Sequence, residues 1–137
     1  MAAFDLDNAP GHLIRRAQQR HQALWTQIVG GELTSVQFAI LTLLLGEPDM
    51  DQRTLAARAS TDTSTLADVW RRLEQRGLLR RDRDAEDGRR YVLRVTPDGE
   101  ALLRRVVPDV RRVGEALLHG LTVDERVALM ALLGKLL

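Results

Sequence analysis

The chain has 137 residues, enough for one domain and too few for two independent folds. It contains no cysteine, which excludes a disulfide scaffold, a thiolate zinc site and a cysteine nucleophile. Hydrophobic residues make up 45% of the chain and aromatic residues only 4%, a composition that favours helices over a β-sandwich.

The first two predicted helices are bounded by clear start and stop signals. Asn8-Ala9-Pro10 opens the first helix, which carries apolar residues at spacings of three and four and runs to about Val29. Gly30-Gly31 ends it. Thr34 and Gln37 form a capping-box pattern that starts a second helix. This second helix is apolar on most sides, so we expect it to be central and buried.

Two further helices and a hairpin are predicted next. Asp51 caps a short third helix, and Asp62 or Thr63 caps a fourth that runs to about Arg76, before Gly77. Residues 78–81 and 90–95 have strand-like composition, and the segment between them is polar, charged and contains one glycine. We therefore expect a β-hairpin with a loop of moderate length.

Two helices are predicted to complete the chain. Thr96-Pro97-Asp98 has the cap, proline and acid of a helix start, and the helix that follows is long. Pro108 interrupts its apolar stripe and is expected to kink it. Gly120 ends it, and Thr122 opens a second capping box for an apolar last helix.

The order of these elements predicts a mainly α fold with a small β-hairpin. Within a single domain, 1–137, a winged helix-turn-helix lobe is expected over residues 34–95. The flanking segments, 8–30 and 97–137, are expected to be dimerisation helices. Their apolar stripes are too extensive for the small lobe to cover, and self-association would also supply the two-fold symmetry of a palindromic operator.

Positive charge is concentrated in one stretch, although the whole chain has a formal net charge of only +1. Nine arginines and five acidic residues lie between Arg71 and Arg94. Such a stretch is either a footprint for DNA phosphates or a solvated surface.

Several motifs in this order resemble the MarR (multiple antibiotic resistance regulator) family of bacterial repressors. They are Leu33-Thr-Ser-Val-Gln37, Leu55-Ala56-Ala-Arg58, Ser64-Thr65-Leu66, Leu73-Glu74-Gln-Arg76-Gly77-Leu78-Leu79-Arg80-Arg81, Asp84-Ala-Glu-Asp87-Gly-Arg89-Arg90 and Thr96-Pro97. The resemblance spans nearly the whole chain and implies a homodimer that binds double-stranded DNA. Thr61 and Thr63 depart from the family pattern, which usually has an aliphatic and a basic residue there.

The candidate DNA-binding residues lie on the fourth helix and in the hairpin. Because Leu66 and Trp70 are expected to face inward, the polar residues on the other faces are candidates for contacts with base edges and phosphates: Thr63, Ser64, Thr65, Asp68, Arg71 and Arg72. The competing interpretation is a polar helix start. In the hairpin, the resemblance implies that Arg89 enters the minor groove and that Asp87 shapes the wing. Arg90 follows directly, and we expect only one of the two arginines to face DNA.

The first helix carries candidates for a ligand site. Arg15 borders its apolar stripe, whereas Arg16 points away. The segment resembles the MarR regulators that respond to aromatic carboxylates, which implies that Arg15 pairs with the ligand acid and that His21 lines the pocket. Trp25 and Phe38 are expected beside them. The alternative is that Arg15 forms an inter-helix or inter-subunit salt bridge and that His21 is a buried histidine with satisfied hydrogen bonds.

No cofactor, metal site or enzymatic motif is predicted. The three histidines have no tight metal-ligand spacing, and we find no nucleophile–base pattern. No apolar run approaches the roughly 20 residues that span a membrane, and the N-terminus lacks a basic signal region, so we expect a cytoplasmic protein. The main prediction is a repressor released from its operator by a small aromatic carboxylate. The alternative is a winged-helix module that binds proteins or ligands without binding an operator.

Overall fold

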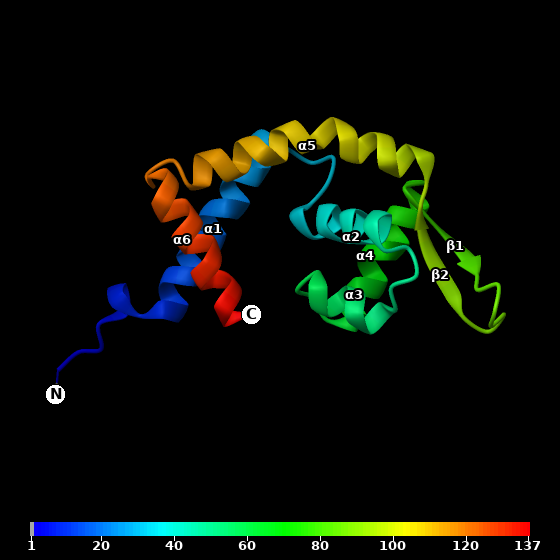
Figure 1. Ribbon diagram of the computed structural model, residues 1–137, viewed down its shortest axis with the longest axis horizontal. Helices are drawn as coiled ribbons and strands as arrows, with labels where there is room; N and C mark the ends of the chain where they lie inside the picture. Colours follow the sequence, from blue (N-terminus) through cyan, green and yellow to red (C-terminus); the bar gives the residue numbers. More distant parts are fainter. Residues whose placement is uncertain (1) are drawn as a thin grey trace. The chain divides into compact units, whose positions relative to one another are not determined.

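The computed structural model describes residues 2–137, which form six α-helices and one two-stranded antiparallel sheet (Figure 1). A 3₁₀ turn, Leu6–Asn8, precedes them. The elements are α1 (Pro10–Ile28), α2 (Ser35–Gly46), α3 (Gln52–Arg58), α4 (Thr63–Gln75), β1 (Leu79–Arg83), β2 (Tyr91–Val95), α5 (Pro97–Leu117) and α6 (Val123–Leu136). The predicted fold class, mainly helical with a small hairpin, is confirmed.

The chain divides into two compact units. One comprises the residues up to Gly30 together with Asp109–Leu137, and the other comprises Gly31–Pro108. Helix α5 is continuous through Pro108 and contributes to both.

Helix α2 is the centre of the Gly31–Pro108 unit, as its composition predicts. Its capping box is present: Thr34 Oγ1 accepts from the Gln37 backbone N–H at 3.1 Å, and Gln37 Oε1 accepts from the Thr34 N–H at 3.0 Å. Ile40, Leu41 and Leu44 are buried, and the helix packs against α3, α4 and β2.

Helices α3 and α4 begin at side-chain caps. Asp51 Oδ1 accepts from the Thr54 N–H at 2.8 Å, and Asp62 Oδ1 accepts from the Thr65 N–H at 2.7 Å. Asp62 is therefore the N-cap that the sequence left open between itself and Thr63. Gly77 ends α4 at a φ of +72°, a left-handed conformation that glycine adopts at little cost.

The strand ends differ from the predicted ranges: β1 begins at Leu79 and β2 at Tyr91, each one residue later than predicted. Arg81 pairs with Leu93 and Arg83 pairs with Tyr91, so β1 extends to Arg83 instead of ending at Arg81. Ion pairs support the charged extension, because Asp82 Oδ2 lies 3.1 Å from Arg80 Nε and 3.4 Å from Arg94 Nε. Opposite charges across a ladder stabilise pairing that the hydrophobic pattern alone does not predict.

The first turn of α5 is fastened to the end of α4. Thr96 Oγ1 donates to the Gly77 carbonyl at 2.6 Å and accepts from the Gly99 N–H at 3.1 Å, so Thr96 is the predicted cap. Gly99 lies so close to this turn that a Cβ atom there would be 2.3 Å from the Leu78 carbonyl oxygen. Only glycine fits this approach of two backbones.

Replacing Gly99 by alanine is therefore expected to destabilise the fold by about 3 kcal/mol, the upper end of the usual cost of overpacking. Gly114→Ala is the matched control, because it lies in the same helix with open space around its Cα. There alanine is expected to stabilise by about 0.5–1 kcal/mol through its higher helix propensity. Chemical denaturation of both variants measures the difference, and equal stability would contradict the close approach.

The other unit contains α1, α6 and the end of α5, and it leaves much apolar surface uncovered. In α1 only Trp25 is buried, and Ala9, rather than Asn8, precedes its first turn. In α6 no residue is buried, and Val127, Met130, Leu132 and Leu136 are each at least 60% exposed. None of the helices in residues 2–137 has the length and hydropathy needed to cross a membrane.

Candidate nucleic-acid interface

The N-terminus of α4 presents three short polar side chains in its first turn. Thr63, Ser64 and Thr65 are all exposed. The Thr65 hydroxyl already donates to Asp62 Oδ2 at 2.9 Å, so it belongs to the cap and keeps only acceptor capacity for a base. The Thr65 backbone N–H first, and then this hydroxyl, lower the pKa of Asp62. Thr63 and Ser64 therefore remain the better candidates for donating to DNA.

The exposed side of α4 continues toward its C-terminus with charged residues. Asp68 and Arg71 form a loose ion pair, with 3.4 Å between Oδ1 and Nη1 and both side chains at least 60% exposed. Such pairs contribute little to stability. The Arg71 guanidinium can therefore exchange this carboxylate for a phosphate at little cost. Arg72 is also exposed.

The tip of the hairpin, residues 84–90, is held in shape by its own hydrogen bonds. Asp87 Oδ1 accepts from the Arg89 N–H at 3.1 Å, and the Asp87 carbonyl accepts from the Arg90 N–H at 3.0 Å. Asp87 thus closes the turn that carries Arg89 and Arg90, and its role in shaping the wing for DNA stays a prediction. The side chains of Arg89 and Arg90 are thereby displayed from a fixed turn.

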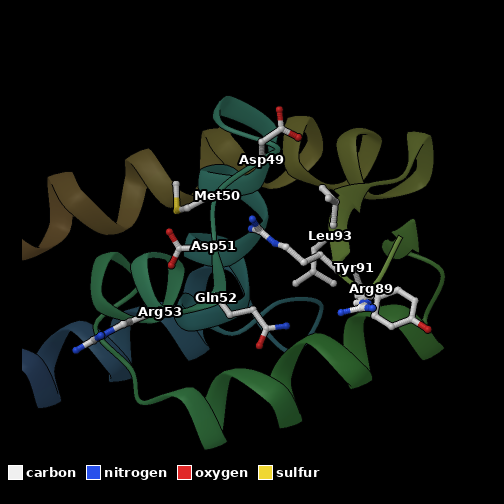
Figure 2. A pocket seen from close by; sticks show the side chains of 10 residues that line it. Asp49, Met50, Asp51, Gln52, Arg53, Arg89, Tyr91 and Leu93 are labelled. Carbon is white, nitrogen blue, oxygen red and sulfur yellow. The ribbon is translucent and has the colours of Figure 1, made fainter. Parts of the chain in front are cut away.

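A groove separates the start of α3 from the hairpin (Figure 2). Its volume is about 410 Å³. Met50, Asp51, Gln52 and Arg53 line it on the α3 side, and Arg89, Arg90, Tyr91 and Leu93 line it on the hairpin side. Both wing arginines thus line one groove. That only one of them faces DNA stays a prediction. We call this the α3–wing groove.

Ion pairing separates the arginines of this unit into two groups. Arg58, Arg94 and Arg105 each lie within 3.6 Å of a carboxylate oxygen. By contrast, no described carboxylate lies within 4.0 Å of Arg53, Arg72, Arg89 or Arg90. These four guanidiniums lie on α3, on α4 and at the hairpin tip, where an external anion can reach them.

The contribution of α3 to this surface was not predicted from the sequence. Arg53 and Gln52 follow directly after the Asp51 cap, and both line the α3–wing groove beside Arg89. The position of Arg53 in the first turn of a capped helix was visible in the sequence. Its proximity to the hairpin required the tertiary structure, because the two segments lie more than 30 residues apart.

The predicted ligand residues fall in both units. On α1, the His21 and Trp25 ring centroids lie 5.9 Å apart, and His21 Nδ1 is buried without a hydrogen-bond partner in the described chain. Arg15 is exposed, and its Nη2 lies 3.5 Å from His12 Nδ1. No carboxylate of residues 2–137 forms an ion pair with Arg15. An inter-subunit salt bridge stays the alternative role for this residue. Phe38 is half-buried on α2, in the other unit.

No group of three or more histidine, aspartate and glutamate side chains in residues 2–137 is arranged to hold a metal ion.

Comparison with known proteins identifies the family. The MarR family model matches residues 33–91. The transcriptional repressor NicR of Pseudomonas putida is 33% identical over 135 residues, which cover 98% of this chain and 85% of NicR. The chain belongs to the MarR family. MarR membership confirms the prediction of a transcriptional regulator.

Two solved MarR structures closely match the fold. PcaV of Streptomyces coelicolor, in complex with its natural ligand, has a TM-score of 0.91 and 44% identity, covering 99% of this chain and 96% of PcaV. BpsR of Bordetella bronchiseptica, whose DNA binding is regulated by 6-hydroxynicotinic acid, has a TM-score of 0.92 and 33% identity, covering 98% of this chain and 97% of BpsR. The predicted winged-helix architecture is therefore confirmed.

Proposed function

We propose that this protein is a homodimeric repressor that binds a palindromic operator and is released by a small aromatic carboxylate. Residues 34–95 form the DNA-binding lobe in this proposal, and 8–30 and 97–137 contain the dimerisation helices. Because the proposed partner is operator DNA, the proposed location is the cytoplasm.

The observation that carries DNA binding is the set of unpaired arginines around α4. Arg53, Arg89 and Arg90 line one groove, and Arg72 extends the positive charge along α4. Guanidiniums bind phosphate oxygens through two parallel hydrogen bonds, and a narrow minor groove attracts them. In our proposal Arg89 enters the minor groove, and Arg53 holds the backbone beside it.

In our proposal the start of α4 recognises the base sequence of the operator. Thr63 and Ser64 lie at a helix N-terminus, where side chains reach base edges and backbone N–H groups face phosphates. Arg71 and Asp68 follow on the exposed side of the same helix. Together with Thr65 and Arg72, these residues form the proposed contact surface in the major groove.

The effector proposal rests on Arg15 and on the aromatic side chains of α1. Arg15 has no carboxylate partner in the described chain, and His21 carries a buried ring nitrogen without a hydrogen bond. A flat acid would satisfy both groups and would pack against the neighbouring Trp25. Phe38, on α2, stays a prediction from the sequence. The regulation of BpsR by 6-hydroxynicotinic acid, an aromatic carboxylate, supports this ligand class.

Release from DNA would follow from a shift between two arrangements of the dimer. In one arrangement the two α4 helices fit the operator, and in the other they are misplaced. A ligand that binds the misplaced arrangement more tightly weakens operator binding, by the difference between its affinities for the two arrangements. In this proposal, occupancy of the ligand site changes the spacing of the two α4 helices in the dimer.

Arg89→Ala tests the DNA-binding proposal. The probe is a duplex that the wild-type protein selects from a random-sequence library. We expect Arg89→Ala to weaken binding about tenfold and to lower the slope of log K against log salt by about one unit per subunit. Fluorescence anisotropy across a salt titration measures both quantities.

Arg16→Ala is the matched control for this experiment. It removes an exposed arginine of α1 that has no carboxylate partner in the described chain, and it leaves the proposed DNA lobe unchanged. Its affinity and salt slope should stay close to those of the wild type. Failure of the wild type to select any duplex would favour the alternative, a winged-helix module without operator binding.

A further inference from the structure

Three guanidinium–aromatic contacts connect α4 to the two strands of the hairpin. The Arg81 Cζ atom lies 4.9 Å from the centroid of the Trp70 ring and 5.3 Å from that of Tyr91. Arg81 Nε is also 3.2 Å from Glu74 Oε2. Arg81, on β1, is therefore held by two residues of α4 and by one residue of β2.

The contacts continue from Tyr91 to the hairpin tip. Arg83 Cζ lies 5.5 Å from the Tyr91 ring centroid, and Arg83 Nη1 donates to the Gly88 carbonyl at 2.7 Å. Gly88 directly precedes Arg89 in the chain. An unbroken series of contacts thus leads from α4 to the residue before the proposed minor-groove arginine.

Strand alternation explains why these side chains meet. Residues 79, 81 and 83 share one face of β1, and their partners 95, 93 and 91 share the same face of β2. Leu79 and Leu93 are buried on this face. The face is therefore the core side of the hairpin, and Arg81 and Arg83 continue it beyond the core.

These arginines are already engaged within the protein, unlike Arg89 and Arg90. A guanidinium that stacks on rings and pairs with Glu74 has exchanged part of its hydration for these contacts. A two-stranded hairpin is marginally stable alone, and its tip needs an anchor if it is to display a side chain at a fixed place. The series of contacts through Arg81, Tyr91 and Arg83 provides that anchor.

We propose that Arg81, Tyr91 and Arg83 are positioning residues that fix the hairpin tip relative to α4, so that Arg89 reaches DNA while α4 reads the operator. The inference rests on the proposed function and deepens it. It assigns two arginines of the basic stretch to positioning the wing and not to phosphate contact.

Two substitutions of Tyr91 separate its ring from its hydroxyl. Tyr91→Leu removes the ring between the two guanidiniums, and Tyr91→Phe keeps the ring but loses the hydroxyl. Operator affinity should fall about tenfold in Tyr91→Leu, as in Arg89→Ala, and should stay within twofold of the wild type in Tyr91→Phe. An equal loss in both variants would mean that the hydroxyl contacts DNA, and it would overturn the proposal.

A double-mutant cycle with Arg89 tests whether Tyr91 affects operator affinity through the hairpin tip. If Tyr91 acts through the hairpin tip, Tyr91→Leu should cost little once Arg89→Ala is present, so the two losses should not multiply. Losses that multiply would overturn the proposal, because Tyr91 would then act independently of Arg89. Circular dichroism and melting temperature check that each variant remains folded.

Arg81→Lys completes the test because it keeps the charge and loses the planar stacking group. If Arg81 positions the hairpin tip, Arg81→Lys should lose about as much operator affinity as Tyr91→Leu. If Arg81 only contacts a phosphate, Arg81→Lys should bind the operator almost as tightly as the wild type. All variants use the duplex selected by the wild type. Failure of that selection would count against the proposed function, whereas a successful selection followed by multiplying losses would count against this inference alone.

Discussion

The variant with Leu132→Asp and Leu136→Asp is expected to be a monomer at micromolar concentration, where the wild-type protein is a dimer. The two leucines on α6 are 60% and 70% exposed in the single chain. Val127 and Met130 on the same helix are also uncovered. Apolar surface of this extent on one helix marks an association site.

The expected effect is large because the proposed interface is symmetric. Each substitution occurs once per protomer, so the dimer loses four apolar side chains and gains four charges. With about 1.5–3 kcal/mol for each of the four buried leucines, the loss is about 6 kcal/mol or more, over ten-thousandfold in the dimer dissociation constant. Operator affinity should fall in parallel, because a monomer binds only one half-site.

Light scattering and sedimentation measure the oligomeric state, and circular dichroism reports whether the variant remains folded. Thr42→Asp, an exposed position on α2 outside the proposed dimerisation helices, is the control for an added charge. It should leave the dimer intact. A wild-type monomer, or a doubly substituted protein that remains dimeric, would contradict the proposed role of α6.

The sequence predicted the helix boundaries well because these depend on local chemistry. Thr34, Asp51, Asp62, Thr96 and Thr122 each accept the hydrogen bond expected of a cap. Each of these bonds joins residues three apart, so the sequence window that contains them is enough to predict them.

The features that sequence reasoning missed depend on residues distant along the chain. The extension of β1 to Arg83 requires Asp82 to meet Arg94 and Arg83 to lie over the Tyr91 ring. The position of Arg53 beside Arg89 requires α3 to fold against the hairpin. Neither arrangement follows from periodicity, since the pattern of apolar residues does not specify where charged side chains meet.

The candidate DNA-binding residues were predicted from the resemblance to the MarR family and from the expected inward face of the fourth helix. The structure adds a distinction that no charge count provides. Arg94 and Arg105 are paired with carboxylates, whereas Arg72 and Arg89 have none within reach in the described chain. Ion pairing with carboxylates decides which arginines of a basic stretch are available for phosphate, and these ion pairs are known only from the folded structure.

Arg15→Ala is expected to abolish the ligand response while leaving operator binding unchanged. Arg15 is exposed on α1 and pairs with no carboxylate in the described chain, so its removal breaks no ion pair there. A bidentate guanidinium–carboxylate pair is among the strongest hydrogen-bonded contacts, and losing it should weaken ligand binding about 100-fold. Arg15→Lys should be intermediate, because it keeps the charge without the planar fork.

Calorimetry with a panel of benzoates, hydroxybenzoates and cinnamates identifies a ligand, and anisotropy with the selected duplex measures DNA release. The uncharged amide of the best acid provides a matched test of the carboxylate. The amide should bind the wild type and the Arg15→Ala variant equally weakly, because it lacks the negatively charged carboxylate that pairs with Arg15 in our proposal. Arg16→Ala, one residue along and on another face of the helix, should respond to the acid as the wild type does. If no acid of the panel binds, or if Arg15→Ala binds the acid as tightly as the wild type does, Arg15 has no part in effector recognition, and its contact with His12 would be its role.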